Sequence, residues 1–288
     1  MNNPVLIVTA WFSRILPDWF KQFVYKLGPV TVILRKILNI FVPKGERVVT
    51  IAAGELAGMR MCLNMKSEKD YWLGTYETKL QSTIHQMVQP GMVAYDVGAN
   101  IGYITLILAK IVGTTGHVFA FEALEGNLDR LHENLKLNDL QSRVEVVSNA
   151  IVDTKRKVRF LKGPSLGTGK ANGSAGRQNF SYSNASIVNG ISLDDFVYDS
   201  GNPPPHIVKI DVEGGEVFVL PGMQRLLVEQ RPLVLIELHG KEAANVVWNL
   251  LIKAGYHICF METDYPEVAS PEMLEWKSYI VGLPMELD

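Results

Sequence analysis

A group of small and polar residues follows a short apolar stretch near the first third of the chain. Asp96, Gly98, Asn100 and Gly102 stand at alternate positions, directly before a segment with helical apolar spacing. Glycine has no Cβ, so it lets the backbone turn sharply and lets a ligand approach main-chain N–H groups. Asn100 stands where a third glycine would be expected, and asparagine tolerates left-handed backbone better than most residues. The pattern predicts a strand, a tight turn and a helix that bind a nucleotide-like ligand.

The turn lacks the cations that a phosphate group usually requires. Loops that bind dinucleotides or triphosphates combine main-chain donors with a Lys or Arg near the phosphates, whereas the nearest basic residue downstream here is Lys110. Glu122 ends the next apolar strand, where a carboxylate can accept both hydroxyl protons of a ribose; alternatively it interacts with a helix N-terminus. Asn149, after a third strand, is either an adenine ligand or a plain turn residue. These features favour S-adenosylmethionine, a cationic nucleoside, over a nicotinamide dinucleotide.

Acidic and imidazole side chains follow two later apolar strands. Asp211 and Glu213 come after one of them, and Glu237 and His239 end the other, on one face by the period-two rule. Methyl transfer from a sulfonium to a hydroxyl requires that the hydroxyl lose its proton, to a general base or with help from a metal. Glu213 or His239 is the expected base. A metal held by Asp211 and His239 is a further alternative, and Asp211 could instead hold the methionine amino group.

The elements that must position these residues alternate along the chain. Apolar strand patterns are separated by helical patterns of ten or more residues, which predicts an α/β fold with a doubly wound, mostly parallel sheet. The candidate side chains should then meet at the carboxyl ends of the strands, where such sheets bind ligands. The expected strands are 92–97, 117–122, 143–148, 206–212, 233–239, 256–261 and 278–283.

Several motifs in this order resemble one protein family. The runs are YDVGANIGYIT, FAFEALEGNLDRLHENLKLN, SLDDF, KIDVEGGE and IELHG. Together they resemble the FkbM family of S-adenosylmethionine-dependent methyltransferases, over roughly Tyr71 to Leu283. The resemblance implies the Rossmann-like class I methyltransferase fold, with seven strands of which one near the edge is antiparallel, and usually O-methylation of a small molecule or glycan. Ala123 stands where the family more often has proline. The expected cofactor-binding residues are Asp96, Gly98, Ala99, Asn100, Gly102, Glu122, Asn149 and Asp211; the expected catalytic residues are Glu213, His239 and Asp211.

The first 45 residues lie outside the resemblance and differ in charge. Residues 1–47 hold seven Lys and Arg against two acidic residues, although the 288-residue chain has a net charge of −2. Aromatic and aliphatic residues recur at helical spacing from Trp11 to Leu27, which predicts an amphipathic helix that Pro17 could kink. This N-terminal helical appendage either packs on the main domain or a second subunit, or lies in a membrane interface.

The remaining chain, 46–288, is expected to be one methyltransferase domain. Residues 47–65 predict a hairpin at its entrance, and 163–190, rich in Gly, Ser and Asn, predict a mobile insertion. Cys62 and Cys259 suggest ordinary buried thiols in a reducing compartment. No apolar segment is long enough to span a membrane, so a cytoplasmic location, peripheral to a membrane at most, is expected.

The residues favour a methyltransferase that moves a methyl group from S-adenosylmethionine to a hydroxyl of a small molecule, glycan or lipid head group. The net charge argues against a nucleic-acid partner. An alternative is a cofactor-binding, membrane-associated interaction protein without transfer activity. A homo-oligomer formed through residues 1–45 is also compatible with the pattern.

Overall fold

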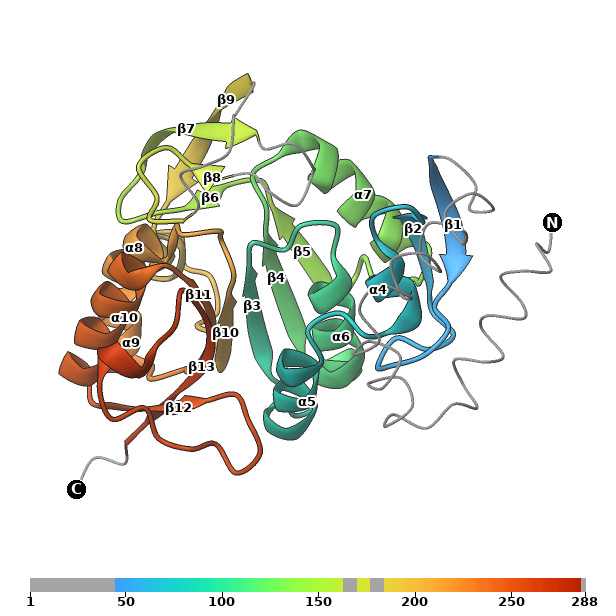
Figure 1. The fold of residues 1–288 in the computed structure, drawn as a ribbon. Coiled ribbons are helices and arrows are strands. Elements are labelled where there is room, and N and C mark those ends of the chain that lie inside the picture. Colours follow the sequence, from blue (N-terminus) through green and yellow to red (C-terminus); the bar gives the residue numbers. More distant parts are fainter. Residues whose placement is uncertain (1–44, 163–169, 177–183, 286–288) are drawn as a thin grey trace, which may run out of the picture. The chain divides into compact units, whose positions relative to one another are not determined.

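The computed structural model describes residues 45–162, 170–176 and 184–285 (Figure 1). The helix predicted between Trp11 and Leu27 lies outside the described residues. The chain divides into two compact units, Met1–Thr78 and Lys79–Asp288. The domain boundary expected at residue 45 stays a prediction.

The described part of the first unit is the predicted hairpin and a short helix. Strands β1 (Glu46–Thr50) and β2 (Arg60–Asn64) pair antiparallel, which confirms the hairpin. Helix α4 (Lys69–Leu73) follows, and the indole nitrogen of its Trp72 donates a hydrogen bond of 3.1 Å to the Thr50 carbonyl. This bond ties the helix to the hairpin.

A seven-stranded sheet forms the centre of the second unit. Its strand order is β12-β13-β11-β10-β3-β4-β5, and β13 runs antiparallel to both of its neighbours. The predicted α/β fold, the number of strands and the antiparallel strand near the edge are confirmed. The strands are β3 (Val93–Val97), β4 (His117–Phe121), β5 (Val144–Val147), β10 (Ile207–Ile210), β11 (Leu233–His239), β12 (Tyr256–Phe260) and β13 (Lys277–Pro284).

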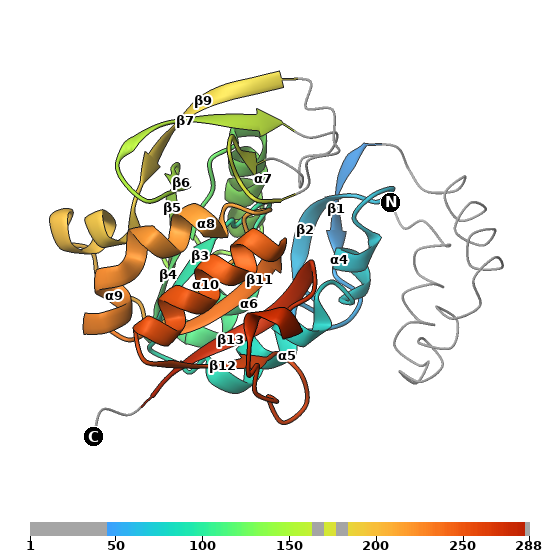
Figure 2. The same cartoon turned by 60° about the vertical axis from the view of Figure 1, so that its left-hand side comes forward.

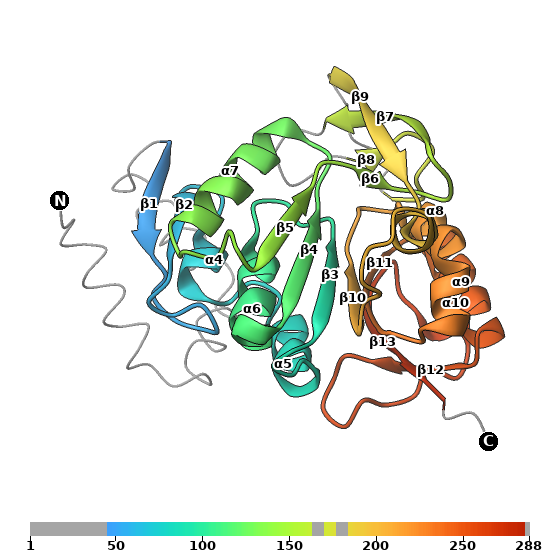
Figure 3. The same cartoon turned by 180° about the vertical axis from the view of Figure 1, so that it is seen from behind.

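Helices cover both faces of this sheet. Figure 2 shows the three helices that follow β10 and β11 in front of the sheet, and Figure 3 shows those near β3, β4 and β5 from the other side. The helix after β10 is interrupted at Pro221, where α8 gives way to a 3-10 turn before α9 begins. The helices are α5 (Thr78–Met87), α6 (Tyr103–Val112), α7 (Glu125–Lys136), α8 (Glu216–Val219), α9 (Gln224–Glu229) and α10 (Lys241–Lys253).

The central strands are buried on both sides, which explains why their sequences are continuous apolar runs. Between the sheet and its helices lies an aromatic group in which Tyr95 meets Phe119, Phe121 and Phe196 edge-on, with centroids 5.3 to 5.7 Å apart. The Tyr95 hydroxyl donates a hydrogen bond of 2.6 Å to the Pro203 carbonyl. This hydrogen bond satisfies the Tyr95 hydroxyl and anchors β3. The glycine turn follows at the carboxyl end of the same strand.

A second, four-stranded sheet corrects the prediction for 163–190. Residues 184–190 are not a structureless insertion, because they form most of β9 (Asn184–Ile191), which pairs antiparallel with β7 (Arg156–Lys162). Two-residue strands complete the sheet, β6 (Ala150–Ile151) beside β9 and β8 (Lys170–Ala171) beside β7. Because β6 begins three residues after β5 ends, this sheet stands at the carboxyl edge of the main sheet (Figure 1).

Two other expectations concern the whole chain. Cys62 and Cys259 are buried and free, as predicted. Among the described residues, no helix combines the length and the apolar character needed to cross a membrane.

Candidate functional site

The glycine turn after β3 adopts left-handed backbone at three alternate residues. The φ angles are +79° at Gly98, +50° at Asn100 and +91° at Gly102. A Cβ on Gly98 would lie 1.9 Å from the main-chain oxygen of Asp211, so no other residue fits at this position. The sequence prediction that Asn100 tolerates this conformation is confirmed. The turn therefore lies directly against the end of β10.

Asp96 lies beneath this turn, fully buried, between two partners. Its Oδ2 accepts a hydrogen bond of 2.6 Å from the Thr105 hydroxyl, and its Oδ1 is 3.0 Å from the Lys209 ammonium. Lys209 stands opposite Asp96 in the parallel ladder and also donates to the Gly98 carbonyl at 3.0 Å. Asp96 therefore acts on the turn through Lys209 and Thr105, and its role in cofactor binding stays a prediction.

Glu122 connects the turn after β3 with the turn after β4. Its Oε2 accepts the Asn100 amide at 2.9 Å, and its Oε1 accepts the amides of Ala123 and Leu124 at 2.9 and 2.8 Å. Burial raises the pKa of Glu122, and these amides together with the Asn127 side chain act in the opposite direction. Four donors already occupy a carboxylate that has about four acceptor positions. A ribose hydroxyl would have to share or replace one of them.

Two further residues expected to bind the cofactor flank these turns. Ala99 is buried and its amide donates to the Phe121 carbonyl at 3.0 Å, which ties the glycine turn to β4. Asn149 is partly buried in the bend after β5, where its amide donates to the Val147 carbonyl at 2.8 Å. The adenine contact of Asn149 stays a prediction.

The segment after β10 has strained backbone at a charged residue. Glu213 has a φ of +51°, and its side chain is 31% exposed. Non-glycine residues with positive φ are uncommon, and such strain concentrates at functional sites.

Burial, followed by the nearby charge of Glu237, raises the pKa of the neighbouring Asp211 to about 7. Acidic groups therefore crowd the carboxyl edge beside the glycine turn.

His239 lies between two buried carboxylates. Its Nδ1 is 3.2 Å from Oε1 of Glu216, and its Nε2 is 3.0 Å from Oε1 of Glu237, which confirms that Glu237 and His239 share one face of β11. Although burial disfavours the charged form, the hydrogen bonds to the two carboxylates raise the pKa of His239 to about 11. An imidazole in this state keeps both protons at neutral pH and cannot accept another.

The Glu237 carboxylate is the most constrained member of this group. Although burial opposes ionisation, hydrogen bonds from His239 and Lys277 lower the pKa of Glu237 to about 2. Lys277, on the adjacent strand β13, contacts the same oxygen that faces His239. One oxygen of each of Asp211 and Glu237 and one nitrogen of His239 all lie within 4.8 Å of one another.

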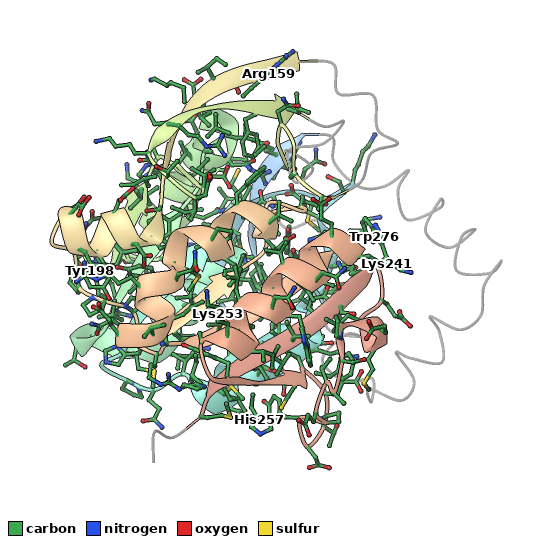
Figure 4. The ribbon with its side chains drawn as sticks, turned by 90° about the vertical axis from the view of Figure 1, so that its left-hand side faces the viewer. Arg159, Tyr198, Lys241, Lys253, His257 and Trp276 are labelled. Atoms are coloured by element: carbon green, nitrogen blue, oxygen red, sulfur yellow. The ribbon has the colours of Figure 1, made fainter. Side chains whose placement is uncertain are left out.

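Two further segments border the acidic group. The Ala175 amide donates to the Gly214 carbonyl at 2.9 Å, so residues 172–176, after β8, lie against the turn after β10. Trp276 meets His239 edge-on, with ring centroids 5.9 Å apart, and it is 40% exposed. Figure 4 shows it beside Lys241, at the end of α10 opposite Lys253. An exposed aromatic ring therefore borders the site.

Sequence reasoning missed three residues of this arrangement. Lys209 could have been found, because it is the one charged residue in the four-residue strand β10 and a buried lysine needs an acidic partner. Thr105 gives no such signal within its apolar helix. Glu216 has the pattern of an ordinary acid at a helix start, and only the tertiary structure brings it to His239.

Comparison with known proteins identifies the family. The Methyltransferase FkbM domain matches residues 96–258, which is more than half of the chain. The chain belongs to the FkbM methyltransferase family. The FkbM segment begins at Asp96 and ends within β12, so it includes both the glycine turn and the acidic group around His239.

Individual FkbM-like and other methyltransferases are similar over part of their length. The hexuronic acid methyltransferase AglP of Haloferax volcanii is 32% identical over 162 residues, which are 56% of this chain and 62% of that protein. This chain thus matches less than two thirds of that relative. A crystal structure of methyltransferase FkbM from Methylobacillus flagellatus is 17% identical with a TM-score of 0.47, covering 74% of this chain and 52% of that one. An O-methyltransferase from Thermotoga maritima is 12% identical with a TM-score of 0.44, and the match covers 84% of this chain and 79% of that one.

Proposed function

We propose that this protein transfers a methyl group from S-adenosylmethionine to a hydroxyl group of a glycan-type acceptor. The site has two halves, the glycine turn after β3 and the acidic group around His239. The observation that carries the proposal is the contact between them, because Gly98 of the turn lies against Asp211 at the end of β10. Both halves fall within the segment that matches the FkbM family. A cofactor held at the turn would thus lie beside the acidic group.

The residues at the turn fit a nucleoside ligand. The side-chain oxygen of Asn100 is buried and has no hydrogen-bond partner within the described part of the chain, and a buried acceptor of this kind calls for an explanation such as an absent ligand. The residues that would hold the cofactor are Gly98, Ala99, Asn100, Gly102, Glu122 and Asn149, with Asp96 supporting them from below. Asp211, which the sequence also suggested for the cofactor, lies with Glu237 and His239 in the acidic group. S-adenosylmethionine, when bound, supplies an electrophilic methyl group on a positively charged sulfur.

The acidic group would then orient and deprotonate the acceptor. Glu213 is the proposed base, because its carboxylate is more exposed than those of Glu216 and Glu237 and can reach an acceptor from outside. Glu216 and Glu237 hold His239 in place from both sides. Alignment of acceptor and methyl group supplies most of the acceleration in such displacements, and these buried contacts favour rigid alignment.

Two observations support a sugar as the acceptor. The related protein from Haloferax volcanii is named a hexuronic acid methyltransferase. Trp276 places an exposed aromatic ring next to His239, and the C–H faces of a sugar ring can pack against such a ring. Lipid head groups and other small hydroxyl compounds stay within the proposed class.

Residues 1–45 would attach the protein to a membrane surface or to a second copy of the chain. The support is the excess of Lys and Arg in this segment and its amphipathic pattern.

The proposal is tested in two steps. Isothermal titration with S-adenosylhomocysteine should show one site per chain, and absence of binding would refute the proposed cofactor. Radiolabelled S-adenosylmethionine should then deliver label to glucuronic or galacturonic acid glycosides. Cofactor binding without transfer to any hydroxyl acceptor in a glycan and lipid panel would favour the interaction protein without transfer activity.

A further inference from the structure

We propose that Asp211, Glu237 and His239 bind one divalent cation, at the edge of the sheet where the acceptor would lie. The chemical role of the cation rests on the proposed function, whereas its binding does not. The three side chains come from the ends of β10 and β11, and one ligand atom from each lies within 4.8 Å of the others. Carboxylate and imidazole ligands bind such ions at about 2.0 to 2.2 Å, so atoms sharing an ion lie at most about 4.4 Å apart. The observed spacing thus needs only small adjustments.

A buried oxygen without a donor points to this ion. Glu237 is 4% exposed, and its Oε1 faces both His239 and Lys277. Its Oε2 has no hydrogen-bond partner among the residues that the structure describes. Leaving a buried acceptor unsatisfied costs about 1 to 3 kcal/mol, and more when the group is charged. A cation bound to Oε2 would remove this cost without displacing Lys277.

Glu216 is placed to support His239 as a metal ligand. Histidines that bind metals usually donate their second ring N–H to a carboxylate, which fixes the ring and its tautomer. Oε1 of the fully buried Glu216 lies 3.2 Å from Nδ1 of His239 and accepts the Gly214 amide at 3.2 Å. The Gly214 amide thus fixes the Glu216 carboxylate, and this carboxylate in turn fixes the His239 ring. Nε2 remains on the side of Glu237, where a cation would replace its proton.

The balance of charge also favours a cation. Four carboxylates gather here, from Asp211, Glu213, Glu216 and Glu237. Within the described residues, Lys277 contacts one of them directly, and Lys209, which is 3.0 Å from Asp96, also acts on Asp211 through its charge. In a purely structural network, the four carboxylates would face His239, Lys277 and Lys209, and Lys209 is shared with Asp96. Oε2 of Glu237 would also stay without a donor among the described residues. A divalent ion accounts for both the acidic excess and this oxygen.

Two carboxylates and one imidazole suit an ion that accepts both oxygen and nitrogen ligands. Mn²⁺ and Zn²⁺ meet this condition better than Mg²⁺ or Ca²⁺, which prefer oxygen alone. Beside an acceptor, the ion would lower the pKa of the hydroxyl. The hydroxyl proton would pass to the Glu213 carboxylate, leaving an alkoxide as the nucleophile.

Binding of Mn²⁺ to the full chain tests the proposal without any assay of activity. Free Mn²⁺ gives a strong electron paramagnetic resonance signal, and its loss on titration should show one bound ion per chain. Pulsed spectra should show nitrogen coupling from an imidazole. Glu237→Gln and Asp211→Asn should each weaken binding at least tenfold, and His239→Asn should abolish the nitrogen coupling. The matched control is Glu242→Gln, an exposed acid in the first turn of α10, which should bind like the unchanged protein.

Three outcomes would overturn the proposal: no bound Mn²⁺ in the unchanged protein, equal binding in Glu237→Gln or Asp211→Asn, or nitrogen coupling that persists in His239→Asn. Circular dichroism checks that each variant is folded, and Asp211→Asn, at a partly exposed position, serves if a buried variant fails to fold. Titration with S-adenosylhomocysteine on the same samples separates the two proposals. Cofactor binding without Mn²⁺ binding refutes the cation site alone, and Mn²⁺ binding without cofactor binding refutes the proposed function alone.

Discussion

At the residue scale, the carboxylate of Glu122 connects the turns after β3 and β4, and its predicted contact with a ribose can be tested by substitution. Glu122→Gln keeps the shape of the side chain but replaces one acceptor oxygen by a donor, which would face the amides that it now accepts. Hydrogen bonds to charged groups contribute about 1.5 to 3 kcal/mol. We therefore expect the Kd for S-adenosylhomocysteine to rise about tenfold or more, measured by isothermal titration.

The control for this variant is Glu125→Gln, at the exposed start of α7. It removes the same charge three residues away and should leave the Kd unchanged. Equal affinity in Glu122→Gln and the unchanged protein would contradict a role for Glu122 in the cofactor site.

The proposed packing of an acceptor sugar against Trp276 can be tested by substitution. Packing of a sugar on this ring would be the same in the ground state and the transition state, so Trp276→Ala should raise KM for the acceptor about tenfold and leave kcat nearly unchanged. Steady-state kinetics with a saturating cofactor measures both constants. Ile252→Ala removes a side chain that is 47% exposed, beside Lys253 at the other end of α10, and should change neither. A fall in kcat alone would contradict the stacking role.

At the scale of elements, the glycine turn depends on space as well as on backbone conformation. Gly98 and Gly113 both have positive φ, but a Cβ would lie 1.9 Å from the Asp211 oxygen at Gly98 and meets nothing within 4 Å at Gly113. Gly113→Ala should cost about 1 to 3 kcal/mol for its conformation alone, because φ +69° and ψ −164° are adopted almost only by glycine. Gly98→Ala should cost at least about 2 kcal/mol more and abolish cofactor binding. Urea unfolding of the two variants compares them, and equal losses would show that contact between the turn and β10 is unimportant.

The pairing of β3 with β10 contains a buried ion pair whose removal should be costly. Lys209→Met leaves Asp96 charged and fully buried, and breaking such pairs from one side costs about 3 to 5 kcal/mol. The double variant Lys209→Met/Asp96→Asn should lose less than the sum of the two single variants, because no charge is left unpaired. Urea unfolding measures all three variants. Additive losses would show that the two side chains do not interact.

At the scale of the whole molecule, residues 1–45 are expected to set where the protein resides or how it assembles. The full chain should sediment with anionic liposomes and lose this property when residues 1–45 are removed. If the segment instead binds a second copy, the truncated chain should form a smaller particle by light scattering. Binding through Lys and Arg should weaken as salt concentration rises. A truncated chain that matches the full chain in both assays would contradict both roles.

Most of the main fold can be predicted from the sequence, because its strands are buried runs with a local signal. The limits of β11, Leu233–His239, match the predicted ones, and β10 lies within its predicted range. The second sheet could not be predicted in the same way. Four of the eight residues of β9 are Ser, Asn or Gly, and they interrupt the β-branched Ile187, Val188 and Ile191, which alone would indicate a strand. Only the pairing with β7 reveals the strand.

The site also contains residues that can be predicted from the sequence and residues whose role cannot. The turn residues have their own signature, because Gly98 and Gly102 meet a backbone requirement that is local in sequence. The state of His239 depends on Glu216, from another element, so its ordinary pKa was a poor guide to its charge. Tertiary neighbours, and not residue type, decide what such a group can do.

Residues 172–176 are attached to the end of β10 by main-chain contacts: the Ala175 amide donates to the Gly214 carbonyl, and Gly176 lies against the Glu213 oxygen. A segment anchored through its backbone keeps its position when its side chains change. Asn172 is exposed within it. Substitutions of Asn172 should therefore leave the position of the segment unchanged, whereas any side chain at Gly176 should disturb it.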